Sequence, residues 1–263
     1  MHNTNQFIIS ILTFFSLHFM SLHRFYCPDS LLVGASVQLP DSAAAHAARV
    51  LRMAEGDQAI LFNGDGNDYM CRLVSIQKSS VTAEVMSVTP VSNESPLNII
   101  LLQGISSGDR MDYTIQKAVE LGVHEIYPIA TERSVVKLDA ARAEKRLEHW
   151  RQVVACACEQ CGRAFVPKVH APLSLKAWLA QHPHSTSCRI QLNPTGAQRL
   201  ADIAKPQHAI ELLIGAEGGL NATEIASATG HGFQSILLGP RILRTETAAL
   251  TAIASMHTLW GDF

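Results

Sequence analysis

The chain has 263 residues, of which 47% are hydrophobic and 17% are charged, and its formal net charge is −2. This is enough apolar material for one large domain or two small ones, and abundant Leu, Ala, Ile and Val with few aromatics favour an α/β protein. Six cysteines in a chain of this length exclude a small disulfide-stapled secreted fold and favour free thiols in a reducing cytoplasm. The near-neutral charge gives no overall sign of a nucleic-acid partner, although a local basic patch is compatible with one.

Residues 1–19 contain an apolar stretch, FIISILTFFSLHF, of the kind found in signal peptides. No lysine or arginine precedes it, no clean cleavage site follows it, and it is too short for a confident membrane span. We therefore expect residues 1–19 to be an extension foreign to the fold, with Met20 as the native start. We also expect no membrane partner.

Residues 20–90 form the first predicted unit, in which short strands alternate with turns. Residues 63–67, Asn-Gly-Asp-Gly-Asn, predict a hairpin turn because Gly and Asn adopt positive φ at low cost. One helix is expected in the stretch AAAHAARVLRM, with Asp41 or Ser42 as its N-cap. Many short strands with one helix predict a small barrel. The expected strands are 24–27, 36–39, 58–62, 69–76 and 81–88.

After the polar segment VSNESP the pattern changes, and residues 91–263 alternate strands with helices. This alternation predicts a mostly parallel sheet covered by helices on both faces. The expected strands are 98–103, 125–130, 166–170, 189–193, 208–214 and 235–238. The expected helices are 110–121, 139–160, 174–181, 221–229 and 245–259.

Two glycine-rich segments follow predicted strands, IGAEGG at 214–219 and LGPRILRTETA at 238–248. Ligands bind outside the carboxyl ends of strands in an open parallel sheet, and glycines let the backbone approach a ligand closely. Asn221 and Glu224 form a capping box for the helix after the first segment. A plain glycine-rich turn is the alternative for one such loop. Neither segment fits the dinucleotide or P-loop patterns, which argues against a dehydrogenase and a P-loop NTPase.

The two segments together resemble the cofactor motifs of the RsmE family of 16S rRNA uridine N3-methyltransferases, within the SPOUT class of S-adenosylmethionine enzymes. The matching stretches are LLIGAEGGL at 212–220, LLGPRILRTETAAL at 237–250, HAARVLR at 46–52, TIQKAVELG at 114–122, EQCGR at 159–163 and the terminal Gly261-Asp262. The resemblance covers roughly residues 20–263, and the second glycine segment is its most specific part. Ala216 stands where the family usually has proline, which should loosen the first loop slightly.

The resemblance implies an α/β fold with a C-terminal trefoil knot and an N-terminal PUA-like barrel. Periodicity would not predict a knot, because true knots are rare. Residues 20–90 would form the RNA-binding barrel and residues 91–263 the methyltransferase domain. The implied cofactor is S-adenosyl-L-methionine, held by the crossing loops of the knot. Its expected binding residues are Leu192, Ile214, Gly215, Glu217, Gly218, Leu238, Gly239, Ile242, Leu243, Thr247 and Ala248.

Three charged residues in these segments are candidates for catalysis: Arg244, Glu246 and Glu217. Uracil N3 must lose its proton before it attacks a methyl group, and a guanidinium beside the ring favours the anion. Arg244 is our first choice for this guanidinium, with Glu217 or Glu246 as the base if Arg244 has no catalytic role. Glu217 is also suited to accept from the cofactor ribose or to lie near the sulfonium.

Other interpretations of these charges stay open. Arg241 and Arg244 are also suited to contacts with rRNA phosphates, or to a structural salt bridge with Glu246 or Glu217. Thr245 is the expected N-cap of the last helix, and Glu246 next to it would stabilise the positive end of the helix dipole without any catalytic role.

RNA recognition must depend on a local patch, because acids outnumber bases in the first unit. The expected RNA-binding residues are Arg24, Arg49, Arg52, Gln160, Arg163 and Arg241. Arg49 and Arg52 share a predicted helix face by their i, i+3 spacing, although a plain solvated face would show the same pattern. For Gln160 and Arg163, ordinary helix termination at Gly162 is the alternative.

The spacing of Cys156, Cys158 and Cys161 invites comparison with a zinc site. These residues lie in a predicted helix, where positions two apart point to nearly opposite sides. Only Cys158 and Cys161 share a face, so we expect packing cysteines and no metal.

The sequence thus predicts an enzyme that methylates N3 of a specific uridine in the 16S rRNA of the small ribosomal subunit. The resemblance further implies a cytoplasmic homodimer joined through the knot domain, with the final helix in the interface. A SPOUT methyltransferase acting on 23S rRNA or tRNA is one alternative. A non-catalytic RNA-binding homologue is the other, although the intact second glycine segment argues against it.

Overall fold

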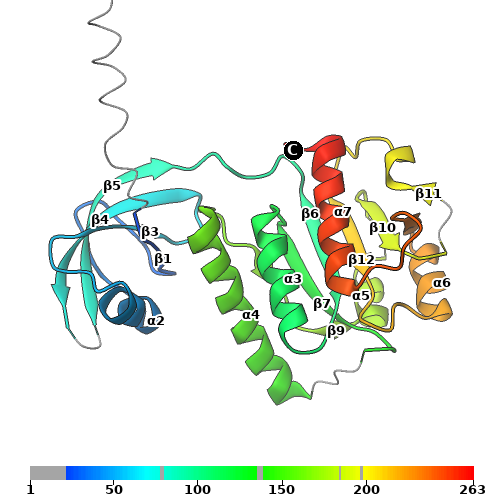
Figure 1. Cartoon of the computed structure of the whole chain (residues 1–263), viewed down its shortest axis with the longest axis horizontal. Coiled ribbons are helices and arrows are strands. Elements are labelled where there is room, and N and C mark those ends of the chain that lie inside the picture. The colour runs from blue at the N-terminus through cyan, green and yellow to red at the C-terminus, as the bar shows by residue number, and fades with distance from the viewer. Residues whose placement is uncertain (1–21, 78–79, 135–138, 184, 196–197) are drawn as a thin grey trace, which may run out of the picture. The chain divides into compact units, whose positions relative to one another are not determined.

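The computed structural model describes residues 22–77, 80–134, 139–183, 185–195 and 198–263, so the expectation for residues 1–19 lies outside the described residues. The chain divides into two compact units (Figure 1). The first unit ends at residue 89, and the second comprises residues 90–263 together with the turn at 63–67. The sequence did not predict that this turn belongs to the second unit. None of the described helices is long and apolar enough to cross a membrane.

The first unit is built on a five-stranded sheet with the order β1-β3-β4-β5-β2. Its strands are β1 (Arg24–Tyr26), β2 (Ser36–Gln38), β3 (Gln58–Phe62), β4 (Asn67–Ile76) and β5 (Val81–Pro90). β1 runs parallel to β3, whereas β3 pairs with β4 and β2 with β5 in antiparallel register. Alternate residues in the middle of β4 and the first half of β5 enter the core, because side chains alternate along a strand; they are Tyr69, Cys71, Leu73, Val81, Ala83 and Val85. The five strands are those that the sequence predicts.

The helix of the first unit is shorter than the sequence predicts. α2 (Asp41–Ala45) follows Pro40 at its N-cap and has no side-chain cap, so the expected capping by Asp41 or Ser42 is wrong. The chain continues into a single wider π-helical turn, η1 (His46–Val50). Proline at the entry fixes φ near the helical value.

Arg52 lies beyond the end of this helical turn. Its φ of 54° is the only positive value found for a non-glycine among the described residues. Because the helix has ended at Val50, the helix face that Arg49 and Arg52 were expected to share is not formed. Left-handed backbone costs a side-chain-bearing residue about 1 kcal/mol or more, and such residues gather at functional sites.

The second unit contains an eight-stranded sheet flanked by helices (Figure 1). The strand order is β11-β13-β10-β12-β6-β7-β8, β9 also pairs with β7, and the pairs are parallel. The strands are β6 (Ile99–Gly104), β7 (Glu125–Ala130), β8 (Lys168–Val169), β9 (Leu173–Ser174), β10 (Cys188–Leu192), β11 (Gln198–Arg199), β12 (Ile210–Ile214) and β13 (Gln234–Leu237). The helices are α3 (Asp109–Glu120), α4 (Ala140–Cys161), α5 (Leu175–Gln181), α6 (Ala222–Gly230) and α7 (Thr245–Trp260), with a 3-10 turn η2 (Leu200–Asp202). The predicted parallel sheet is confirmed.

Local signals determine where several of these elements begin and end. The Asp139 carboxylate accepts from the Arg142 N–H at the start of α4, and Gly162 ends that helix with a φ of 82°. Asn221 and Glu224 form the predicted capping box of α6. The sequence did not predict β9, β11 and η2, which have only two or three residues each.

The chain crosses itself where α7 begins. Thr245 Oγ1 donates to the Gly215 carbonyl oxygen at 2.6 Å and accepts from Gln103 Nε2 at 2.8 Å. A Cβ on Gly104 would lie 2.2 Å from the backbone N of Ala216, so the end of β6 touches the loop after β12 directly. α7 also contacts η2, which precedes it by more than forty residues. These contacts place the start of α7 against the ends of β6 and β12, where the SPOUT fold is expected to form its knot.

Candidate functional site

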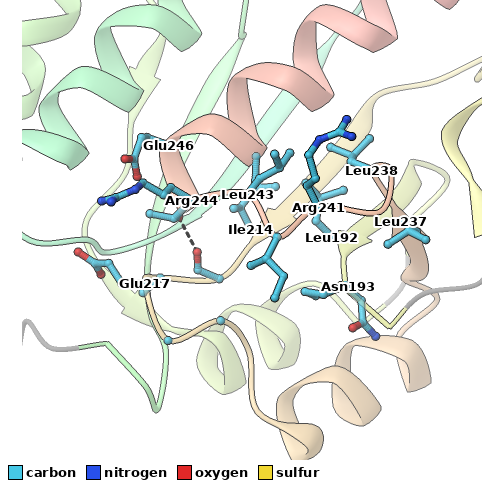
Figure 2. A pocket seen from close by; sticks show the side chains of 18 of the residues that line it. Leu192, Asn193, Ile214, Glu217, Leu237, Leu238, Arg241, Leu243, Arg244 and Glu246 are labelled. Carbon is cyan, nitrogen blue, oxygen red and sulfur yellow. Dashed lines mark hydrogen bonds between the residues drawn. The ribbon is translucent and has the colours of Figure 1, made fainter.

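A pocket with a volume of about 410 Å³ lies at the carboxyl ends of β10, β12 and β13 (Figure 2). Three loops form its walls, at 193–194 after β10, at 215–219 after β12 and at 238–244 before α7, together with the first turn of α7. Parallel strands place their following loops at one edge of the sheet, where ligand sites form. Both glycine segments identified in the sequence therefore meet in this pocket.

One part of the pocket is apolar. Figure 2 shows Leu192, Ile214, Leu238 and Leu243 grouped there, on loops or strand ends from three parts of the chain. Such a surface suits a flat ring like adenine, which gains affinity from apolar contact on its faces. Ile242 lies at the rim with 86% of its surface exposed, so its side chain contributes little to this wall.

Glycine is favoured for a different structural reason in each of the two loops. A Cβ on Gly215 would lie 2.7 Å from the backbone of Gly219 and Leu220, so its missing side chain lets the first loop close on itself. Gly239 has a φ of 72°, which disfavours any other residue, and a Cβ there would meet only the Arg241 guanidinium, at 3.9 Å. Close packing within the loop, and not only approach to a ligand, therefore explains Gly215.

Glu217 connects the first glycine loop to the start of α3. Its Oε1 accepts from the N–H and the hydroxyl of Ser107, both at 2.8 Å, and from Arg110 Nη1 at 3.3 Å. Burial alone would raise the pKa of Glu217, but these hydrogen bonds outweigh it and lower the pKa below its ordinary value. Glu217 is consequently ionised at neutral pH, and its buried Oε2 has no partner among the described residues.

Arg244 occupies the N-cap position of α7, where its carbonyl oxygen accepts from the Ala248 N–H at 2.8 Å. Figure 2 shows its side chain at the same end of the pocket as Glu246 and Glu217. Within the described chain its guanidinium forms no ion pair, so the alternative of a structural salt bridge with either acid is not realised. The buried Oε2 of Glu246 also lacks a partner there.

Two expectations around the start of α7 need correction. Thr245 does not cap the helix, because its hydroxyl is committed to Gly215 and Gln103 at the crossing. Thr247 is exposed and does not line the pocket, whereas Ala248 does. A threonine at a strand-to-helix junction is a common N-cap, so only the tertiary contact with β6 and β12 distinguishes the two roles.

The sequence did not predict several of the residues that surround the pocket. Arg110 lines it from α3 and Ser107 holds Glu217, although more than one hundred residues separate them from the glycine loops. The remaining unpredicted lining residues are Asn193, Pro194, Ala216, Gly219, Ile236, Leu237 and Thr245. The only sequence signal near Arg110 was the stretch TIQKAVELG at 114–122, which resembles the family and begins four residues after Arg110.

The residues expected to bind RNA differ in their exposure and in their partners. The Arg163 side chain is 5% exposed and paired with Glu94, so the prediction that it contacts RNA is wrong. Arg24 is mostly buried, pairs with Asp68 and lies over the Phe62 ring. The other four, Arg49, Arg52, Gln160 and Arg241, are exposed.

The pocket fits S-adenosylmethionine better than it fits a metal. The apolar wall suits the adenine ring. The Oε2 atoms of Glu217 and Glu246, which have no partner in the described part of the chain, suit ribose hydroxyls or the cationic methionine end. Among the described residues no group of three or more His, Cys, Asp or Glu side chains is arranged to hold a metal ion.

Comparisons with known proteins agree with this geometry. The RNA methyltransferase domain family matches residues 93–257, and the RNA methyltransferase PUA domain family matches residues 39–86. A ribosomal RNA small subunit methyltransferase E from Bacillus subtilis is 34% identical over 80% of this chain and 85% of its own. The protein of that name from Buchnera aphidicola subsp. Acyrthosiphon pisum is 31% identical over 91% of this chain and 94% of its own.

A solved structure gives the same result at higher identity. The crystal structure of a ribosomal RNA small subunit methyltransferase E from Neisseria gonorrhoeae, bound to S-adenosyl methionine, is 45% identical with a TM-score of 0.85. The match covers 92% of this chain and 99% of that one. The parallel sheet, the pocket between its glycine loops and the PUA match thus lead to one conclusion: the chain belongs to the ribosomal RNA small subunit methyltransferase E family.

Proposed function

We propose that the protein methylates N3 of a uridine in 16S rRNA, with S-adenosyl-L-methionine as the methyl donor. The observation that carries this proposal is the pocket itself, which combines an apolar wall with two carboxylate oxygens and an arginine that have no partner among the described residues. A relative with 45% identity has S-adenosyl methionine bound, which supports the choice of donor. The cytoplasmic location stays a prediction.

The chemistry requires that the uracil ring lose its N3 proton and that the resulting anion be stabilised. Bound S-adenosylmethionine supplies an electrophilic methyl group on a cationic sulfur. Arg244 offers a planar, permanently charged donor group to the carbonyl oxygens that flank N3, which gain charge as the proton leaves. Its backbone is held by α7, so the donor is oriented before the substrate arrives.

Of the two acids in the pocket, Glu246 is the better candidate for the N3 proton. The pKa of Glu217 is lowered by Ser107 and Arg110, which makes it a weaker base and commits it to holding the loop. Glu246 lies in the first turn of α7 and has a buried oxygen with no partner among the described residues. We propose Glu246 as proton acceptor and Glu217 as an acceptor toward the cofactor.

Transfer of tritium from labelled S-adenosylmethionine to rRNA tests the function. We expect label in 16S rRNA or small subunits, and digestion to nucleosides should place it on N3 of uridine. Label in 23S rRNA or tRNA would favour the alternative substrates. Binding of 16S rRNA without any transfer would favour a non-catalytic RNA-binding protein.

Arg52 is the best candidate for an RNA contact in the first unit, because it retains a side chain at a position where glycine is favoured. Arg52→Gly should leave thermal stability unchanged or raise it by up to about 1 kcal/mol, since the left-handed strain is removed. Affinity for 16S rRNA should fall severalfold, with a smaller salt dependence, because one phosphate contact is lost. Arg146→Ala, an exposed arginine on α4, is the matched control. Lower stability with unchanged RNA affinity would assign Arg52 a structural role.

We also propose that the protein is a homodimer joined through the knot region. Ile242 in the second glycine loop is 86% exposed, and Leu259 and Phe263 at the end of α7 are 45% and 65% exposed. Apolar side chains of this size on one terminal segment are typical of a surface that is buried on association. Light scattering at micromolar concentration should give twice the chain mass, and a monomer would contradict the proposal.

A further inference from the structure

The segment that joins the two units is bound to the second unit at several points. Asn93 Nδ2 donates to the Gly162 carbonyl oxygen at 2.9 Å, and Glu94 pairs with Arg163. Ser95 Oγ lies 3.4 Å from His257 Nδ1. We call these three contacts the linker clasp. They engage three consecutive residues of VSNESP, a segment whose polarity is typical of a flexible linker.

Arg163 is the central residue of the linker clasp. Its Nε contacts both oxygens of Glu94, at 3.0 and 3.2 Å, and its Nη2 donates to Oε2 at 2.6 Å. Its Nη1 donates to the carbonyl oxygens of Val119 and Val123, at 2.8 and 3.0 Å. The Arg163 guanidinium thus connects Glu94 of the linker to the carboxyl end of α3, where the free carbonyl groups of the helix favour a cation.

The contact at Ser95 involves two further stretches of the chain. His257 is 1% exposed, and its Nδ1 also lies 2.9 Å from Asp262 Oδ1. A Cβ on Gly122 would lie 2.8 Å from Ser95 Cβ, and one on Gly261 would lie 2.6 Å from His257 Nδ1. The stretches EQCGR and Gly261-Asp262, and the glycine that ends TIQKAVELG, therefore meet at the linker and not at the pocket.

We propose that Glu94 and Arg163 are positioning residues for the RNA substrate. Residues 39–86 match a PUA domain of RNA methyltransferases, and the chain passes from that unit to the pocket-bearing unit through the clasped segment. Two linked sites that bind one RNA gain affinity from their effective concentration, and the gain is larger when the connection is already ordered in the bound geometry. A clasped linker loses less conformational entropy on binding than a free one does. This proposal rests on the methyltransferase function proposed above.

The test uses Glu94→Gln in the full chain, because this change keeps the shape of the side chain and removes its charge. We expect the KM for 16S rRNA and the Kd of the RNA complex to rise about tenfold. The kcat at saturating RNA and the affinity for S-adenosylmethionine should stay within twofold of wild type, since the pocket is untouched. Glu148→Gln, which removes an exposed acid 3.9 Å from Arg151 on α4, is the matched control.

Hydrogen exchange provides a second readout that does not depend on catalysis. In Glu94→Gln the amides of residues 91–97 should exchange faster than in wild type, while those of β6 and β12 should not change. Asn93→Ala, a milder change, should show the same pattern to a smaller extent. The proposal would be overturned if Glu94→Gln exchanged faster but kept the wild-type RNA affinity and KM. It would also be overturned if this variant lost as much affinity for S-adenosylmethionine as for RNA. If wild type binds rRNA without methylating it, the proposed function fails, but the RNA affinity of Glu94→Gln still decides the role of the clasp.

Discussion

Arg244→Ala should lower kcat by about 10²-fold, or about 2.7 kcal/mol of transition-state stabilisation, as the loss of one preorganised donor to a developing anion does. Arg244 lines the pocket, is held at the N-cap of α7, and has no ion pair within the described chain. Removal of its side chain should therefore leave no buried charge unpaired. We expect a Tm within about 2 °C of wild type, which is typical of an exposed substitution.

Two further variants separate catalysis from binding. Arg244→Lys should recover only part of the lost turnover, because an ammonium group does not reproduce the planar two-donor geometry of a guanidinium. Arg241→Ala, in the same loop, should raise the KM for RNA with little change in kcat if that residue contacts phosphate. Single-turnover methylation at saturating RNA and cofactor measures these effects. Wild-type turnover in folded Arg244→Ala would remove Arg244 from the mechanism and leave Glu246 as the next residue to substitute.

Gly104→Ala should destabilise the second unit by about 3 kcal/mol or more, because the added carbon has no space to occupy. It would lie 2.2 Å from the Ala216 N and 2.5 Å from the carbonyl carbon of Gly215, both of them backbone atoms. No rotamer change can relieve such a contact, so β6 or the first glycine loop must shift. We expect a fall in Tm of roughly 10 °C and a loss of S-adenosylmethionine binding, since the shifted loop forms one wall of the pocket.

Gly230→Ala is the matched control for this substitution. Gly230 is the last residue of α6, and a Cβ there would meet no atom within 4 Å. Alanine has the better helix propensity, so this variant should be as stable as wild type or more stable by up to about 1 kcal/mol. Differential scanning calorimetry and titration with S-adenosylmethionine check both variants. Equal melting temperatures for Gly104→Ala and Gly230→Ala would show that the first glycine loop shifts at little cost, and that β6 does not pack tightly against it.

Much of the second unit is predictable from sequence because its signals are local. Apolar runs in β6 and β12, the capping box at Asn221 and Glu224, and glycine at the end of α4 each act within a few residues. Pattern analysis therefore identifies these elements and predicts a parallel sheet with ligand loops at its carboxyl edge. The knot, the PUA-like fold and the cofactor came from resemblance to a family, because periodicity contains no information about how a chain crosses itself.

The amino-acid sequence by itself determined the order of strands and helices and the two glycine loops that line the pocket. Only the tertiary structure decided which polar groups meet, because those partners are distant in the chain. Thr245 looks like a helix cap until Gly215 and Gln103 are placed beside its hydroxyl. Arg163 looks like an exposed RNA contact until Glu94, sixty-nine residues away, is paired with it. Hydrogen bonds and ion pairs act over about 3 Å, so a side chain's role depends on neighbours that only the folded chain supplies.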